Sequence, residues 1–233
     1  MITNQTIQRL SGIVVRSLLA VALLIGGFVV QPVQASTMPT APAPIPATLN
    51  ADEIAGLLFM REEEKLAHDV YGALAATWDL PIFANIARSE QQHTDAVRFV
   101  IGQYGLTDPA AGNAPGIFVD PTLQALYNDL VAQGSQSLVA ALQVGAIIEE
   151  TDITDLQTRI AQTNHGDIAQ LYANLLHGSS NHLRAYVSTW ARATGEEYVP
   201  QYLDQESYDA IISGTVNNGR GGQGRGGHSP RGR

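Results

Sequence analysis

Residues 82–97, IFANIARSEQQHTDAV, place a glutamate and a histidine three residues apart within an apolar pattern of helical period. In an α-helix, positions i and i+3 lie on the same face about one turn apart, so Glu90 and His93 can reach a single metal ion. A carboxylate oxygen together with an imidazole nitrogen suits iron or manganese. The E-x-x-H pattern alone recurs on many exposed helices. It indicates a metal site only if other helices direct ligands to the same place.

Three other segments of helical period carry such a group on or beside their apolar stripe: Glu64, Glu149 and His182. Glu149 is favoured over its neighbour Glu150 because it shares a stripe with Asp152, one turn later. A charged group on a core-facing stripe is unfavourable unless a partner neutralises it. Four helices that each direct a carboxylate or an imidazole inward are typical of a metal site inside a four-helix bundle. Our candidate metal ligands are Glu64, Glu90, His93, Glu149, His182 and Asp152.

The helical periodicity predicts an all-α fold. Asn50 and Glu53 form a capping-box pattern at the start of the first helix, and we expect Asp79 and Asn164 to begin the second and fourth. A break with two prolines and three glycines follows the second helix. The predicted helices cover about 51–77, 81–104, 121–134, 136–162 and the region from 164 onward, with a short one after Asp204. The short helix over 121–134 belongs to the long crossover between the second and third long helices, which are 81–104 and 136–162. Two hairpins joined by such a crossover form the ferritin-like order of elements.

Both ends of the chain differ in composition from the part between them. Residues 1–35 have a short apolar run and a small-residue site at Ala35, which predict a signal peptide and export to the periplasm or beyond; an uncleaved anchor is the alternative. Residues 36–49 are rich in Pro and Ala and predict a linker, and residues 214–233 predict a disordered Gly/Arg-rich tail. One domain over 50–213 is expected between them.

Charge and cysteine content exclude several kinds of site. Of the 13 basic residues, two lie in the signal segment and four in the tail, which leaves seven against all 22 acidic residues. The predicted domain thus carries about −15, which argues against nucleic acid as its partner and favours cations. The chain has no cysteine, so thiolate zinc sites, iron–sulfur clusters and disulfides are excluded.

The segments REEEKLAHDVY (61–71), FANIARSEQQHTDAV (83–97) and GSSNHLRAYV (178–187) resemble the ferritin-like superfamily, and within it the rubrerythrin side. They are also similar to an exported group of ferritin-like domains, and the resemblance spans about residues 50–194. It implies that Glu64 is the first-helix ligand, with Glu62 and Glu63 pointing outward. It also implies a two-metal site of iron or manganese.

The sequence departs from that family at Ser179. The fourth helix should carry a glutamate three residues before His182, and a serine cannot bridge two metals as a carboxylate does. Three outcomes stay open: an asymmetric two-metal site in which Asp152 compensates, a single-metal site, or a site that has lost its metal. If the missing carboxylate weakens the site, Ser179→Glu is expected to increase metal occupancy.

Two functions are compatible with these residues. The first is an exported di-iron or di-manganese protein acting on oxygen, peroxide or ferrous iron, as a monomer or small homo-oligomer. Its electrons would come from an unknown external donor, because no second metal centre is possible without cysteine. The second is a non-catalytic helical bundle whose buried polar stripe is only a hydrogen-bonded network. We expect Tyr71 and Tyr186 to be core residues near the site, and we assign no role to His165 or His177.

Overall fold

The computed structural model describes residues 48–214, which form six α-helices and contain no β-strand. The all-α prediction is therefore confirmed. The helices are α2 (Ala51–Thr77), α3 (Pro81–Gln103), α4 (Pro121–Gly134), α5 (Leu138–Gln162), α6 (Gly166–Thr194) and α7 (Gln205–Ile212). The expected signal peptide, nearly all of the expected linker and the tail after residue 214 lie outside the described residues. Between residues 48 and 214, no helix combines the length and the apolar character needed to cross a membrane.

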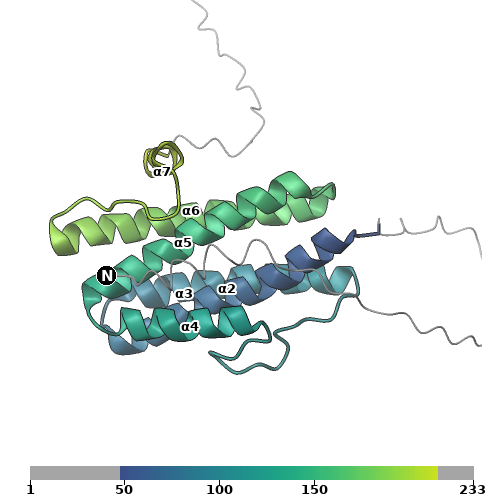
Figure 1. Cartoon of the computed structure of the whole chain (residues 1–233), viewed down its shortest axis with the longest axis horizontal. Helices are drawn as coiled ribbons and strands as arrows, with labels where there is room; N and C mark the ends of the chain where they lie inside the picture. The colour runs from purple at the N-terminus through teal and green to yellow at the C-terminus, as the bar shows by residue number, and fades with distance from the viewer. Residues whose placement is uncertain (1–47, 215–233) are drawn as a thin grey trace, which may run out of the picture.

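Two helical hairpins, α2–α3 and α5–α6, form the larger part of the structure (Figure 1). They contact each other through α2 with α5 and through α3 with α6. The connection between the hairpins contains α4, which packs on both α2 and α5, whereas α7 packs on α6. All four long helices therefore share one interior, and α4 covers one side of it.

The start of α2 follows the sequence prediction closely. The Asn50 side chain accepts hydrogen bonds from the backbone N–H groups of Asp52 and Glu53, both at 2.9 Å, and Glu53 accepts one from the Asn50 N–H at 3.0 Å. This reciprocal pair satisfies donors that the first turn of a helix leaves free. The predicted capping box is confirmed.

The starts of α3 and α6 differ from the prediction. The residues that precede them are Leu80 and His165, and neither makes a side-chain capping bond. Asp79 and Asn164, which we expected to begin these helices, therefore cap neither of them. At α3 the local reason for the missing cap is Pro81 in the first turn. Proline has no N–H, and an N–H at this position of a helix has no partner within the helix anyway.

A polar layer separates two apolar clusters along the helices. One cluster includes Tyr71, Phe83 and Ile147, and the other includes Leu57, Val97 and Leu175. Each long helix passes from one cluster to the other and contributes polar side chains at the level between them. We define the polar layer as Glu63, Glu64, Glu90, His93, Glu149, Asp152, Ser179 and His182. The apolar clusters above and below hold these groups at one height because their own packing fixes the helix positions.

Polar side chains of α2 attach the loop before α4 to the helix. Glu62 accepts hydrogen bonds from the N–H groups of Val119 at 2.6 Å and Asp120 at 2.9 Å. Arg61 donates to Thr94 at 2.7 Å and pairs with Asp108 at 3.1 Å. Thr94 belongs to α3, whereas the contacts with Asp108, Val119 and Asp120 hold the crossover against a face of α2.

The expectation that Glu62 and Glu63 point outward was wrong. Both are buried, with 4 % and 9 % of their surface exposed. The helical pattern of α2 alone suggested one core-facing stripe. In the structure α3, α5, α4 and the crossover loop surround this helix, so positions off that stripe are covered as well.

The buried Glu53 carboxylate joins the start of α2 to the turn between α5 and α6. Besides the Asn50 N–H, it accepts hydrogen bonds from Thr163 Oγ1 at 2.8 Å and the Asn164 N–H at 3.1 Å, and it pairs with His165 Nδ1 at 2.7 Å. Burial alone would raise the pKa of Glu53, but these partners lower it to about 2. His165, to which we assigned no role, is thus part of a structural contact.

Glu53 should make the fold sensitive to acid. A depressed pKa means that the ionised carboxylate stabilises the fold above its ordinary pKa of 4.5 and that this contribution is lost as the pH falls toward about 2. At neutral pH we expect Glu53→Gln to lower the free energy of unfolding by about 1 to 2 kcal/mol. Urea denaturation at several pH values would measure it. The difference between the two proteins should shrink below pH 4.5, and a difference that does not change with pH would contradict this role.

Candidate metal centre

Five of the candidate ligands meet in the polar layer, one or two from each long helix. They are Glu64 of α2, Glu90 and His93 of α3, Glu149 of α5 and His182 of α6. The three glutamates are at most 2 % exposed. Their ligand atoms form two groups, each with all its atoms within 4.8 Å of one another: Glu64, Glu90 and His93, and Glu90, Glu149 and His182. Glu90 belongs to both groups.

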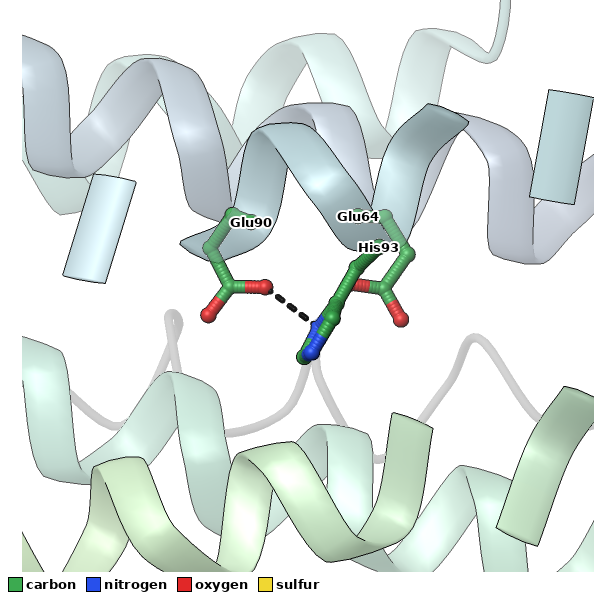
Figure 2. A group of neighbouring side chains, drawn as sticks. All are labelled: Glu64, Glu90 and His93. Atoms are coloured by element: carbon green, nitrogen blue, oxygen red, sulfur yellow. Dashed lines mark hydrogen bonds and ion pairs between the residues drawn. The ribbon is translucent and has the colours of Figure 1, made fainter. Parts of the chain in front are cut away.

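The first group lies between α2 and α3. His93 Nδ1 is 2.8 Å from Glu90 Oε2 and 3.2 Å from Glu64 Oε2. Figure 2 shows Glu64, Glu90 and His93 extending from the α2–α3 hairpin toward the opposite pair of helices. The three-residue spacing of Glu90 and His93 has the consequence predicted from it, since both side chains reach one point from one helix.

The second group connects the two hairpins. His182 Nδ1 lies 2.7 Å from Glu90 Oε1 and 3.5 Å from Glu149 Oε2. The ring nitrogen on the other side, Nε2, lies 2.9 Å from Ser89 Oγ. The rings of His93 and His182 are stacked, with centroids 5.4 Å apart. Each imidazole therefore directs Nδ1 to the shared Glu90.

The charges of the five groups depend strongly on one another. Burial alone would lower the pKa of both histidines, but the adjacent carboxylates raise the pKa of His93 to about 12 and that of His182 to about 10. Burial would raise the pKa of Glu90, but its contacts with the two histidines lower it to about 2. Burial raises the pKa of Glu64 to about 7, although His93 opposes this. Without a metal ion, protonated imidazoles are the cations that balance the buried carboxylates.

Three carboxylate oxygens of the polar layer are buried and have no partner among the described residues: Glu63 Oε2, Glu64 Oε1 and Asp152 Oδ1. Glu90 Oε1 and His182 Nδ1, by contrast, pair with each other at 2.7 Å. Buried polar atoms normally have partners, so a concentration of unpartnered ones in a single layer requires an explanation. In each of the two groups, carboxylate oxygens and an imidazole nitrogen form a set of donors that suits a divalent iron or manganese ion.

Further residues hold the ligands in place. The Tyr71 hydroxyl donates a hydrogen bond to Glu149 Oε1 at 2.6 Å. Burial and the charge of Glu149 raise the pKa of Tyr71, so the hydroxyl keeps its proton and remains a donor. Tyr186 lies next to Tyr71, with ring centroids 5.4 Å apart. The expectation that both tyrosines lie in the core near the site is confirmed. Hydrogen bonds of this kind orient metal ligands in many proteins.

Glu150 is buried like Glu149 but faces the other way. It accepts hydrogen bonds from the Tyr198 hydroxyl at 2.6 Å and from the N–H groups of Gln201, Tyr202 and Leu203 at 2.7 to 2.9 Å. It thereby holds the segment between α6 and α7 against the helices. The preference for Glu149 as the inward-facing residue agrees with this geometry.

Sequence reasoning missed two residues at the centre. Ser89, which contacts His182, lies beside the stripe, three residues after Ile86 and four before His93, but a serine there gives no specific signal of this contact. Gly178 is different, because a glycine inside a helix often marks a close approach of another group. A Cβ at position 178 would lie 2.3 Å from His93 Nε2, so the ring occupies the space that the missing side chain leaves.

A cavity of about 20 Å³ lies beside the candidate metal ligands, between α2, α4 and α5. Its walls include Glu64, Glu90 and Glu149 on one side and, from α4, Leu123, Leu126 and Leu130 on the other. A water molecule needs roughly 10 to 15 Å³ by the same measure, so a molecule of about this size can stand next to the carboxylates.

Comparison with known proteins gives the family. Residues 53–215 match the model described as "Uncharacterized protein domain (DUF2202)". The chain is 46 % identical over 171 residues to "Uncharacterized protein MJ0754" of Methanocaldococcus jannaschii, which covers 73 % of this chain and 92 % of that protein. A solved structure named "Crystal structure of hypothetical protein MJ0754 from Methanococcus jannaschii DSM 2661" is similar with a TM-score of 0.69 and 45 % identity, over 76 % of this chain and 98 % of the other.

These matches establish relatives over most of the chain, and none of the names states an activity. None of these names mentions ferritin-like proteins, so the resemblance to that superfamily stays a prediction. The family match begins two residues after the start of α2 and includes the rest of the four long helices, and so the whole polar layer. The chain belongs to the DUF2202 family.

Proposed function

We propose that this protein binds two divalent ions, iron or manganese, in the polar layer of a ferritin-like bundle, and that these ions support redox chemistry with oxygen or peroxide. The observation that carries the proposal is the position of Glu90, which belongs to two groups of ligand atoms. Glu64 and His93 would hold one ion, Glu149 and His182 the other, and the two oxygens of Glu90 would serve both.

The ferritin-like part of the proposal rests on the order and contacts of the helices. Two hairpins joined by a long crossover, with a carboxylate or imidazole from each of four helices, is the arrangement known for di-iron carboxylate bundles. Export through residues 1–35, an external electron donor and a monomeric or small oligomeric state belong to the same proposal. They are supported by the sequence alone.

Bound iron or manganese would supply electrons to oxygen or peroxide, and the positive charge of the ions would rise as they are oxidised. The residues of this chain would do the rest. The carboxylates of Glu64, Glu90 and Glu149 neutralise the ions in a buried place. Tyr71 and Ser89 fix the orientation of Glu149 and His182. The leucines of α4 restrict the cavity beside the cluster to small molecules, which favours oxygen or peroxide over an organic substrate.

Metal analysis tests the proposal directly. Protein purified from medium supplemented with iron and manganese should contain close to two such ions per chain, and the loaded protein should consume peroxide or oxygen when a reductant is added. The metal-depleted protein is the control. A folded chain that takes up no metal would instead favour the non-catalytic bundle. Bound metal without turnover would limit the proposal to metal binding.

Gly178→Ala should weaken one ion site selectively. The new Cβ would displace His93, which lies 2.3 Å from its position, and should reduce affinity at the Glu64–Glu90–His93 group by about 10-fold or more. The group that contains His182 should bind its ion nearly as before. Titration with Mn²⁺, followed by calorimetry, would resolve the two affinities.

Gly72→Ala is the matched control, because a Cβ at that position of α2 meets no atom within 4 Å. It should leave both affinities unchanged and stabilise the helix slightly, by about 0.5 to 1 kcal/mol. Equal effects of the two substitutions on metal affinity would show that Gly178 has no special relation to His93.

A further inference from the structure

Ser179 occupies the place where the resemblance predicts a carboxylate, and it does not stand alone there. It is completely buried, and its hydroxyl donates a hydrogen bond to Asp152 Oδ2 of α5. The same hydroxyl lies 3.1 Å from the Leu175 carbonyl oxygen, one turn earlier in α6. The position on α6 is therefore filled by a pair of side chains, a serine from α6 and an aspartate from α5.

The second oxygen of this aspartate has no partner. Asp152 is 6 % exposed, and its Oδ1 finds no hydrogen-bond donor among the described residues. Asp152 lines the cavity beside the cluster together with Glu64, Glu90 and Glu149. Burial and the charges of Glu64, Glu149 and Glu90 raise its pKa, as expected for an acid that stands close to all three.

We propose that Asp152 is the carboxylate ligand that replaces the missing glutamate of α6, and that Ser179 is the positioning residue that holds it. This inference rests on the proposed function. Asp152 is not one of the residues in the two groups of mutually close ligand atoms. Its unpartnered Oδ1 would be the ligand atom, while Oδ2 keeps the hydrogen bond from Ser179.

The sizes of the Asp152 and Ser179 side chains support the replacement of a glutamate on α6 by an aspartate from α5. An aspartate is one methylene shorter than a glutamate, and Asp152 starts from α5, one turn after Glu149. It can enter the space next to α6 only because residue 179 is small. This also changes the expectation for Ser179→Glu. The longer acid would meet the Asp152 carboxylate in a fully buried place, so the substitution should lower metal occupancy unless Asp152 is also replaced.

The test compares Mn²⁺ binding of the full chain with that of Asp152→Asn, by calorimetric titration and electron paramagnetic resonance. Asparagine keeps the shape and can still accept the hydrogen bond from Ser179, so the fold should be retained. The unmutated chain should bind two coupled ions. Asp152→Asn should bind one ion normally and the second more than about 100-fold more weakly, with a spectrum of isolated Mn²⁺. The metal-induced rise in melting temperature should fall accordingly.

Asp155→Asn is the matched control. It makes the same substitution at a buried aspartate on the same helix, one turn farther along, next to Glu63 and Arg159. It changes an acid that contacts Glu63, which belongs to neither group of ligand atoms, so this variant should still bind two coupled ions. A loss equal to that of Asp152→Asn would show that only the local charge matters and would overturn the assignment.

Ser179→Ala tests the positioning role. It should keep two ions but weaken the second by about 10-fold, because Asp152 loses the donor that orients it. Full affinity in this variant would overturn the role of Ser179, and full affinity in Asp152→Asn would overturn the role of Asp152. If the unmutated chain binds no metal, the proposed function fails and this inference fails with it. If the chain binds two ions and both variants match it, only this inference fails.

Discussion

Glu90→Gln is expected to remove both metal ions, whereas Glu64→Gln and Glu149→Gln should each remove one. Glu90 approaches His93 through Oε2 at 2.8 Å and His182 through Oε1 at 2.7 Å, so each of its oxygens serves a different group of ligands. An amide carries no charge and offers one oxygen in place of two. We therefore expect the affinity for both ions to fall by more than about 100-fold.

Metal content after dialysis against a weak chelator would measure this effect. Gln91→Ala is the control, because Gln91 follows Glu90 in α3 but is exposed to solvent. Circular dichroism should show an unchanged helix content in every variant. A Glu90→Gln protein that retains one tightly bound ion would contradict the shared position of Glu90 and would reduce the centre to two independent sites.

Glu150→Ala should cause the largest loss of stability, with no direct effect on the metal. The carboxylate is completely buried and accepts four hydrogen bonds, one from the Tyr198 hydroxyl and three from backbone N–H groups of residues 201–203. Its removal leaves these donors without an acceptor. We expect the free energy of unfolding to fall by about 3 kcal/mol. For a domain of this size, that corresponds to a decrease in melting temperature of about 6 to 12 °C.

Glu197→Ala is the matched control, because Glu197 is exposed and lies next to Tyr198 in the same segment. It should change stability by less than about 0.5 kcal/mol. Differential scanning calorimetry of both variants, with and without metal, would separate stability from binding. If Glu150→Ala instead lost metal and kept its stability, the choice of Glu149 over Glu150 as the inward-facing residue would be wrong.

Most of the helical architecture could be predicted because it depends on local interactions. The capping box of Asn50 and Glu53 involves residues three apart, and the apolar period of each segment describes one helix at a time. The starts of α3 and α6 were harder to predict. Asp79 and Asn164 are good capping residues, but Pro81 and the contact of Asn164 with Glu53 decide what happens there.

The buried state of Glu62 and Glu63 could not be predicted from α2 alone. A run of five charged residues, Arg61 to Lys65, normally indicates a solvated face. Here Glu62 and Arg61 contact the crossover, and Glu63 lies near Asp152 and Asp155 of α5. Their partners are more than thirty positions away in the sequence, so no local pattern reveals them.

The sequence by itself determined which residues can act together within one helix. Glu90 and His93 must share a face of α3, and Asp152 must follow Glu149 on α5, because helical geometry leaves no alternative at that spacing. Only the tertiary structure decided that Glu90 serves two groups, that Ser179 holds Asp152, and that His93 lies against Gly178. These relations depend on the rotation and separation of the two hairpins, which the packing of the apolar clusters on either side of the polar layer sets.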